Sequence, residues 1–404
     1  MQFKLLQTYR TVSNFSISLI MEFIPFLVLW NAAPVYGLSK AMILMFCYWA
    51  MQNLFILLFN FLLKKQYFKK PQIFLLLRIL PIIACEICIL FLHTNALWVI
   101  ILAALFSGME NSFNYVPTEI IYNYVTEGEG TKVLGFTRFL DQMGWVVAGT
   151  VGGLFLDYIS KTLVVGVSLI LFLASAVPLV IFYFKFRKTA NFNTDYVSYL
   201  VAQQEGSEKV KKLRRSFLVK HFVANFLISP FYYLFYYVAE VAIYINTESF
   251  FITGIMSSIF DGIYGIACLY VGKILSRCDG KNLATIMGFV MFGLMLVCFF
   301  VPNVYAMCTA FLLCAFIQPF IILHPYQDFL DKARILGVGN DMLINYGSAQ
   351  VSSYVFCYTL GACGGMLLPV IIASSVIGVV GILFGRKAEE STTQDLVNYL
   401  SNNK

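Results

Sequence analysis

The sequence predicts an all-α membrane protein with twelve membrane-spanning helices in two bundles of six. Three observations lead to this prediction. Of the 404 residues, 60% are hydrophobic and 12% are charged, whereas soluble domains carry about 25% charged residues. The hydrophobic residues form runs that are long enough to cross a bilayer, and the basic residues gather on one side of those runs.

The apolar runs define the expected spans in order. The first run follows Lys4 and Arg10. We interpret it as a retained helix, because it is too long for a cleaved signal and contains Glu22 and Pro25. A spanning helix needs about 20 mostly apolar residues. Runs of this kind lie at 13–35, 41–63, 72–92, 96–118, 134–156 and 162–184 in the first half, and at 217–243, 250–275, 283–301, 304–323, 342–361 and 366–385 in the second.

The basic residues set the expected orientation. Every Lys and Arg except Lys40 and Lys161 falls on the side of the membrane where the chain begins. Cytoplasmic loops collect Lys and Arg, so we expect a multi-pass cell-membrane protein with both termini in the cytoplasm. The net charge of +7 then reflects membrane topology, and no basic patch is left over to indicate nucleic-acid binding.

One polar stretch divides the chain. Residues 185–216 form the only long polar interior segment, so we expect it to be a cytoplasmic linker. The predicted organisation is a first bundle over 1–184, this linker, a second bundle over 217–385, and a cytoplasmic tail over 386–404. The basic cluster at 209–215 is either a solvated charge run or a contact with anionic lipid headgroups.

Two sets of six helices with both ends inside and a long central loop resemble the major facilitator superfamily over the whole chain. Residues 272–281, GKILSRCDGK, are similar to the superfamily's loop signature Gly-x-Leu-x-Asp-Arg-x-Gly-Arg-Lys. Ser276 stands in the place of the acid, and one extra residue precedes the second glycine. The resemblance implies a gating loop whose residues are Gly272, Arg277, Asp279, Gly280 and Lys281.

Two further motifs bear on direction and substrate. Residues 144–153, GWVVAGTVGG, resemble the glycine-rich fifth-helix motif of the superfamily's exporters, although plain helix packing requires small residues as well. The superfamily's fourth-helix arginine motif is absent, because Glu110, Asn111 and Asn114 occupy that region without an Arg. Short fragments at 21–23 and 61–65 are similar to bacterial glycolipid flippases, which leaves a lipophilic solute open.

Acidic residues inside the apolar runs are the main candidates for mechanism. A charged side chain at the bilayer centre costs at least about 2.5 kcal/mol. Glu22 is the first candidate for proton coupling, with a hydrogen bond to a neighbouring helix as the alternative. The resemblance implies that the first and fourth helices of each half line a central cavity, which places Glu22 and Glu110 beside it. Further coupling or cavity candidates are Asn111, Asn114, Asp141, Glu240, Asp261, Tyr233, Tyr237 and Gln318, with Asn345 and Gln350 as additional polar positions. Asp141 is also expected to form an ion pair with Arg138 on the same helix.

These features predict a secondary transporter that moves a small or amphipathic solute by alternating access, driven by protons and directed to export. A proton-coupled uptake symporter and a non-transporting membrane sensor or enzyme are the alternatives. Catalysis is not expected, because the His residues lie at predicted membrane edges and no soluble loop is long enough to hold a substrate. No nucleotide-binding signature, cofactor site or metal site is expected, and we predict a monomer whose partners are the solute and the bilayer.

Overall fold

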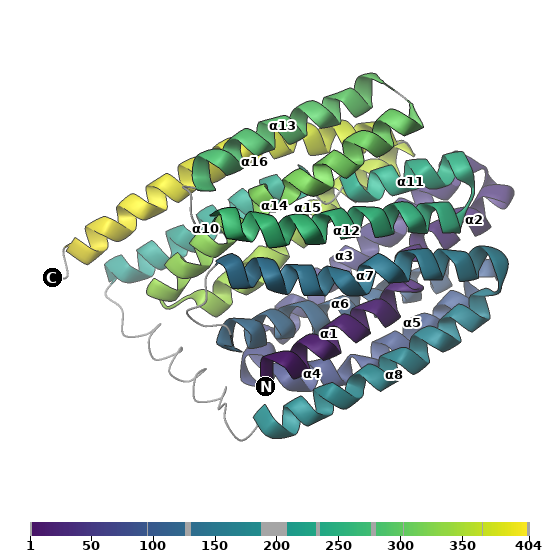
Figure 1. Cartoon of the computed structure of the whole chain (residues 1–404), viewed down its shortest axis with the longest axis horizontal. Helices are drawn as coiled ribbons and strands as arrows, with labels where there is room; N and C mark the ends of the chain where they lie inside the picture. The colour runs from purple at the N-terminus through teal and green to yellow at the C-terminus, as the bar shows by residue number, and fades with distance from the viewer. Residues whose placement is uncertain are drawn as a thin grey trace.

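The computed structural model describes residues 2–94, 96–125, 131–186, 208–231, 235–275, 280–301, 303–365 and 367–401. Within these residues the chain is helical and contains no β-strand. The long helices run side by side along one axis; the C-terminus lies at the left of the view, and α1 runs from the N-terminus toward the right (Figure 1). We call the left end, from which α1 runs and where the C-terminus lies, the terminal end of the molecule, and the right end the far end.

The helices follow the predicted runs. The first half contains α1 (Gln2–Ser18), the 3₁₀ turn η1 (Met21–Phe23), α2 (Ile24–Tyr36), α3 (Leu38–Lys69), α4 (Pro71–Leu77), α5 (Ile79–Phe91), η2 (Leu92–Thr94), α6 (Leu97–Val125), α7 (Thr131–Tyr158) and α8 (Lys161–Phe186). The second half contains α10 (Glu208–Ser229), α11 (Phe235–Thr247), α12 (Phe250–Leu275), α13 (Gly280–Phe300), α14 (Val304–Ile335), α15 (Gly339–Gly364) and α16 (Leu367–Ser401). Part of the predicted linker and tail is therefore helical, since α10 begins at Glu208 and α16 continues to Ser401.

Nine helical segments of the described chain are long and apolar enough to cross a membrane. The predicted spans at 217–243, 283–301 and 342–361 are not among them. The first of these is divided between α10 and α11, the apolar part of α13 is short, and α15 is rich in small polar residues. An all-helical membrane fold is thus confirmed, while the count of twelve spans in two sets of six stays a prediction.

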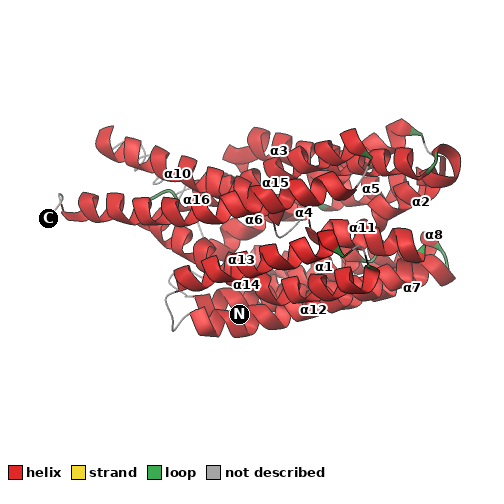
Figure 2. Cartoon of the chain, turned by 90° about the horizontal axis from the view of Figure 1, so that it is seen from above, coloured by secondary structure: helices red, strands yellow, loops and turns green. Residues whose placement is uncertain are grey.

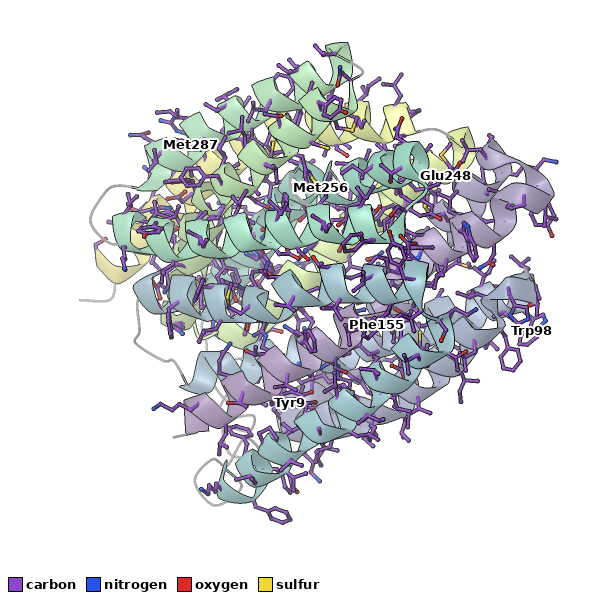
Figure 3. All side chains as sticks on the ribbon, turned by 45° about the vertical axis from the view of Figure 1, so that its right-hand side comes forward. Tyr9, Trp98, Phe155, Glu248, Met256 and Met287 are labelled. Atoms are coloured by element: carbon purple, nitrogen blue, oxygen red, sulfur yellow. The ribbon has the colours of Figure 1, made fainter. Side chains whose placement is uncertain are left out.

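Exposed aromatic and aliphatic side chains cover the outside of the helices. Trp98, which is 62% exposed, projects from the far end (Figure 3). Tyr158, the last residue of α7, and Trp30 of α2 are exposed as well. Aromatic side chains of this kind gather where a membrane protein passes from the hydrocarbon core to the headgroups. Ile170 and Phe61 are among the large apolar side chains that are exposed between the two ends. Such a surface suits lipid rather than water.

One helix in each half departs from regular α-helical geometry. The first begins as α1, breaks after Ser18, and resumes as α2 at Ile24, with Pro25 in the first turn of α2. Pro suits this position because the first turn needs no donor from its nitrogen. In the second half, α10 ends at Ser229, Pro230 and Phe231 are π-helical, and α11 begins at Phe235. A proline lies next to each of these changes, whereas α14 continues through Pro319.

The two halves meet along two pairs of helices. One pair is α7 with α12 and the other is α3 with α15, and the pairs lie at opposite edges of the molecule (Figure 2). Between α7 and α12 the approach depends on glycine: a side chain at Gly254 would strike the carbonyl of Gly149, and one at Gly153 would strike the carbonyl of Phe250. Gly152 faces the carbonyl of Leu19 in the same way. The glycine-rich motif at 144–153 therefore packs α7 against both α12 and the first broken helix.

Candidate transport pathway

An internal cavity of about 220 Å³ lies between the two halves. Drug-sized ligands occupy sites of about 300–1,000 Å³, so this cavity suits a smaller solute. None of its lining side chains is charged, and the polar ones are carboxamides and tyrosine hydroxyls. The lining residues are Trp49, Gln52, Asn53, Ile56 and Asn60 from α3, Asn111 and Tyr115 from α6, Tyr237 from α11, and Gly347, Gln350, Val351, Tyr354 and Tyr358 from α15.

Helical periodicity places the α3 residues on one wall of the cavity and the α15 residues on another. The lining residues of α3 and of α15 recur every three or four positions, which is the spacing of a single helix face. Hydrogen bonds fix the amides on that face. Gln52 Nε2 donates to Ser107 Oγ at 2.5 Å, and Asn60 Oδ1 accepts from Ser112 Oγ at 2.7 Å. On the opposite wall, Gln350 Nε2 donates to the hydroxyl of Tyr354 at 2.8 Å.

Aromatic contacts close the cavity toward the far end. Trp49 stacks on Tyr358 with ring centroids 5.0 Å apart and also contacts Tyr237 at 5.6 Å. Closer to the far end, the rings of Phe26 and Tyr244 lie 5.4 Å apart, again one from each half. These contacts bury rings without directional polar bonds.

Asp157 at the end of α7 adds a polar contact at the far end. Its two carboxylate oxygens accept from the backbone N–H groups of Phe250 at 3.2 Å and Phe251 at 2.9 Å, and from the hydroxyl of Ser249 at 2.7 Å. The first turn of α12 is thereby capped by a carboxylate of the other half. This cap fixes where α12 starts relative to α7.

Polar contacts close the cavity toward the terminal end. Lys64 Nζ of α3 lies 2.8 Å from Asp341 Oδ1 of α15. Across the other side, the hydroxyl of Tyr326 on α14 donates to Glu119 Oε2 on α6 at 3.1 Å. Both contacts join one half to the other, so the terminal end is closed by an ion pair and a hydrogen bond.

A network of buried charges supports Glu119 within the first half. Glu119 Oε1 lies 3.6 Å from Arg10 Nη2 and 3.5 Å from Arg138 Nη2. Arg10 Nε in turn lies 3.1 Å from Asp141 Oδ1, which also accepts from Gln7 Nε2 at 3.3 Å. The ion pair expected between Arg138 and Asp141 is replaced by pairs to other helices, because α1 and α6 bring opposite charges closer than the local spacing does.

Three acidic side chains from the two halves lie within electrostatic range of one another. Glu22 lies in η1, Glu240 in α11 and Asp261 in α12. Glu240 and Asp261 are buried, and Glu22 is partly accessible. The charges that act on Glu22 are those of Asp261 and Glu240, which carry the same sign. Ser257 donates a hydrogen bond to Glu240, and Glu240 acts electrostatically on Tyr358 of the cavity wall.

The structure separates the predicted cavity residues. Asn111, Tyr237 and the additional position Gln350 line the cavity. Asn114, Asp141 and Gln318 do not: Asn114 accepts from Thr118 one turn away, and Gln318 is buried in α14. The cavity-lining residues of α3 were not singled out from the sequence. Their side-chain amides, Gln52, Asn53 and Asn60, do recur at helical spacing within an apolar run, which is a signal that could have found them.

Glu110 faces away from the cavity. Its Oε1 lies 2.5 Å from both Nε and Nη2 of Arg78, and the two side chains are 4% and 2% exposed. Arg78, which the charge count placed with the cations of the cytoplasmic side, thus lies between helices rather than in a loop. Arg78 is buried because Glu110 neutralises it, Tyr9 and Ser13 accept from its Nη1 at 3.2 and 3.4 Å, and the Phe172 ring lies 5.5 Å from its guanidinium carbon.

The predicted gating loop is described only in part. Gly272 is buried in α12, and Gly280 begins α13, where a side chain would strike the ring of His324. Lys281 is the second residue of α13. Arg277 and Asp279 lie outside the described residues, as does Tyr233. Among the described side chains, no three His, Cys, Asp or Glu residues are placed to hold a metal ion.

The family model of the Major Facilitator Superfamily matches residues 11–377. The chain belongs to this superfamily. Membership makes it a multi-pass membrane transporter of a small-molecule solute rather than an enzyme. No curated protein matches the chain.

Solved structures share the superfamily fold. A crystal structure of a bacterial homologue of the iron transporter ferroportin in the outward-facing state aligns with a TM-score of 0.68 at 10% identity, covering 98% of this chain and 100% of that one. The inward-facing structure of a bacterial ferroportin homologue aligns with a TM-score of 0.60 at 13% identity, covering 96% and 98%. At these identities the likeness is one of fold.

Proposed function

We propose that this superfamily member is a proton-coupled secondary transporter that exports a small polar organic solute across the cell membrane by alternating access. The observation that carries the proposal is the placement of Glu22, Glu240 and Asp261 within electrostatic range of one another, with Glu240 one turn of α11 from Tyr237 of the cavity wall. Glu22 lies where the first helix is interrupted, and interrupted helices are typical of binding sites in transporters.

The three carboxyl groups suit proton coupling. Like charges held together in a buried place repel, and a bound proton relieves that repulsion. Glu22 belongs to the first half, and the other two belong to the second. Gain or loss of a proton therefore changes the force between the halves, and a proton favours the arrangement that brings them together.

The cavity wall indicates the class of solute. Carboxamides and tyrosine hydroxyls both donate and accept hydrogen bonds, and the Trp49 and Tyr358 rings offer flat apolar faces. A small uncharged or zwitterionic organic molecule with a planar part matches this lining better than a lipophilic one. Iron is a second candidate, because the solved structures that share this fold are of bacterial homologues of an iron transporter.

Charge and packing support the direction. The positive-inside rule assigns the terminal end, which carries the basic residues, to the cytoplasm. In that orientation the ion pair of Lys64 with Asp341 closes the cytoplasmic side. The glycine motif of α7, which resembles that of exporters, packs against α12 and the first broken helix at the level of Glu22, so it borders the coupling group.

Flux in proteoliposomes tests the proposal. Vesicles that hold the wild type are given a pH gradient and offered neutral amino acids, nucleosides and monosaccharides, with Fe²⁺ as a separate arm. We expect the gradient to drive one of the organic classes. In Glu22→Gln, exchange of that solute down its own gradient continues, but the pH gradient no longer drives accumulation.

Glu208→Gln is the matched control, because it removes a carboxylate that is 85% exposed at the start of α10. It should transport as the wild type does. Equal accumulation by Glu22→Gln and the wild type would exclude Glu22 from coupling. Movement of Fe²⁺ alone would replace the organic solute by a metal ion.

A further inference from the structure

A basic groove lies at the terminal end, away from the transport cavity. It runs between α10 and the start of α15 and has a volume of about 470 Å³. Its lining residues are Lys211, Arg214, Arg215, Leu218, Val219 and Phe222 from α10, with Val338 and Asn345 from the other side. We propose that this groove binds an anionic phospholipid, with the phosphate headgroup on the basic residues and an acyl chain along the apolar ones.

Lys211, Arg214 and Arg215 give the groove its positive charge, and no acidic side chain is among the described residues that line it. Lys220 and Lys332, which lie outside the groove, have acids beside them: Lys220 Nζ lies 2.9 Å from Asp395, and Lys332 Nζ lies 2.5 Å from Asp328. The groove thus presents a concentrated positive charge that complements a phosphate.

Lys212 makes the contrast clear on α10 itself. It follows Lys211 in sequence, but it lies outside the groove and approaches Glu208 Oε1 at 3.9 Å on another face of the helix. Basic residues that serve only to set membrane topology do not need to lie on the same face of a helix. Lys211, Arg214 and Arg215 do share one, at the spacing of a single helical turn.

The apolar floor identifies a lipid rather than a soluble anion. Leu218, Val219 and Phe222 continue the same face of α10 beyond the cations, and Val219 is 55% exposed. At about 1.5 Å per residue, Phe222 lies roughly 10 Å further along the helix than Arg215. This is the separation of a phosphate from the upper part of its acyl chains, and a free phosphate would leave these side chains uncovered.

The groove also touches the closure of the transport pathway. Arg214 Nε donates to the carbonyl of Leu336 at 2.7 Å, at the turn where Gly337 adopts a φ of +69°. This turn leads into α15, whose Asp341 pairs with Lys64 of the other half. A headgroup held by Arg214 and its neighbours would therefore fix the position of α15 at the terminal end. This last step rests on the proposed orientation, while the binding itself does not.

Binding of defined lipids to the purified full-length protein tests the proposal without any transport. Native mass spectrometry compares phosphatidylglycerol with phosphatidylcholine for the wild type, for Lys211→Gln/Arg215→Gln and for Lys212→Gln, with inorganic phosphate as a competitor. We expect the wild type to prefer phosphatidylglycerol. The double variant should lose roughly thirtyfold of that preference, since each basic residue near an anionic surface contributes about fivefold.

Lys212→Gln should keep the wild-type preference. Equal loss in this control and in the double variant would show a diffuse surface charge, and an unchanged preference in the double variant would show binding elsewhere. Both results would overturn the groove as the site. Displacement of the lipid by millimolar phosphate would assign the groove to a soluble anion. Failure of transport with lipid preference intact would refute only the proposed function.

Discussion

The buried pair of Arg78 and Glu110 gives the sharpest test of the packing within the first half. Glu110→Gln removes the negative charge and leaves the guanidinium, which is 2% exposed, without its counter-charge. The remaining contacts of Arg78 with Tyr9, Ser13 and Phe172 are neutral. Removing one partner of a buried ion pair costs about 3–5 kcal/mol, because the other charge stays buried. We expect a loss of this size in the free energy of unfolding.

A double-mutant cycle measures the pair directly. Unfolding of the purified protein in detergent is compared for the wild type, Glu110→Gln, Arg78→Met and the double variant. The double variant should regain most of what either single variant loses, since it buries no unmatched charge. Glu390→Gln is the control: its pair with Arg386 is exposed on both sides, so it should change stability by less than about 1 kcal/mol. Additive losses in the double variant, or a loss below about 1 kcal/mol in Glu110→Gln, would refute the reasoning.

Two further predictions concern the contacts between the halves. Gly254→Ala should abolish solute flux in proteoliposomes, because the added methyl group would strike a carbonyl of α7. Gly166→Ala is the control and should transport normally, because no atom lies within 4 Å of the added carbon. Normal flux in Gly254→Ala would contradict the close packing of α7 and α12. Lys64→Gln should raise the rate at which an aqueous maleimide modifies a cysteine introduced at Ile56 in the cavity, by up to about fivefold, since a pair with a 42% exposed lysine contributes less than about 1 kcal/mol. An unchanged rate would mean that Asp341 does not hold the terminal end closed.

Features that depend on local composition followed from the sequence. Runs of apolar residues indicated where helices lie, because hydrophobic patterning is a local property of the chain. Acids within those runs pointed to Glu22, Glu240 and Asp261, since each is costly to bury alone. Their meeting at one place depends on how the two halves pack, and no local pattern contains that information.

The direction in which a side chain faces did not follow. Glu110 and Asn111 are neighbours on α6, yet one pairs with Arg78 inside the first half and the other lines the cavity. Successive residues on a helix point about 100° apart, so an uncertainty of one residue exchanges these roles. The burial of Arg78 could not be predicted from local sequence either, because it depends on Glu110, a partner 32 positions along the chain.

The two ends of the cavity are closed by different chemistry, and this difference bears on how the protein cycles. Toward the far end the halves meet mainly through aromatic rings such as Trp49 and Tyr358, whose contact depends little on protonation or salt, and Asp157 adds a carboxylate contact with the start of α12. Toward the terminal end they meet through Lys64 with Asp341 and through Tyr326 with Glu119, which depend on charge. The carboxyl cluster at Glu22 lies where α1 and α2 are interrupted, so in the proposed coupling a proton there acts on the two segments of this helix separately. That coupling would let one protonation event loosen one closure and leave the other in place, which alternating access requires.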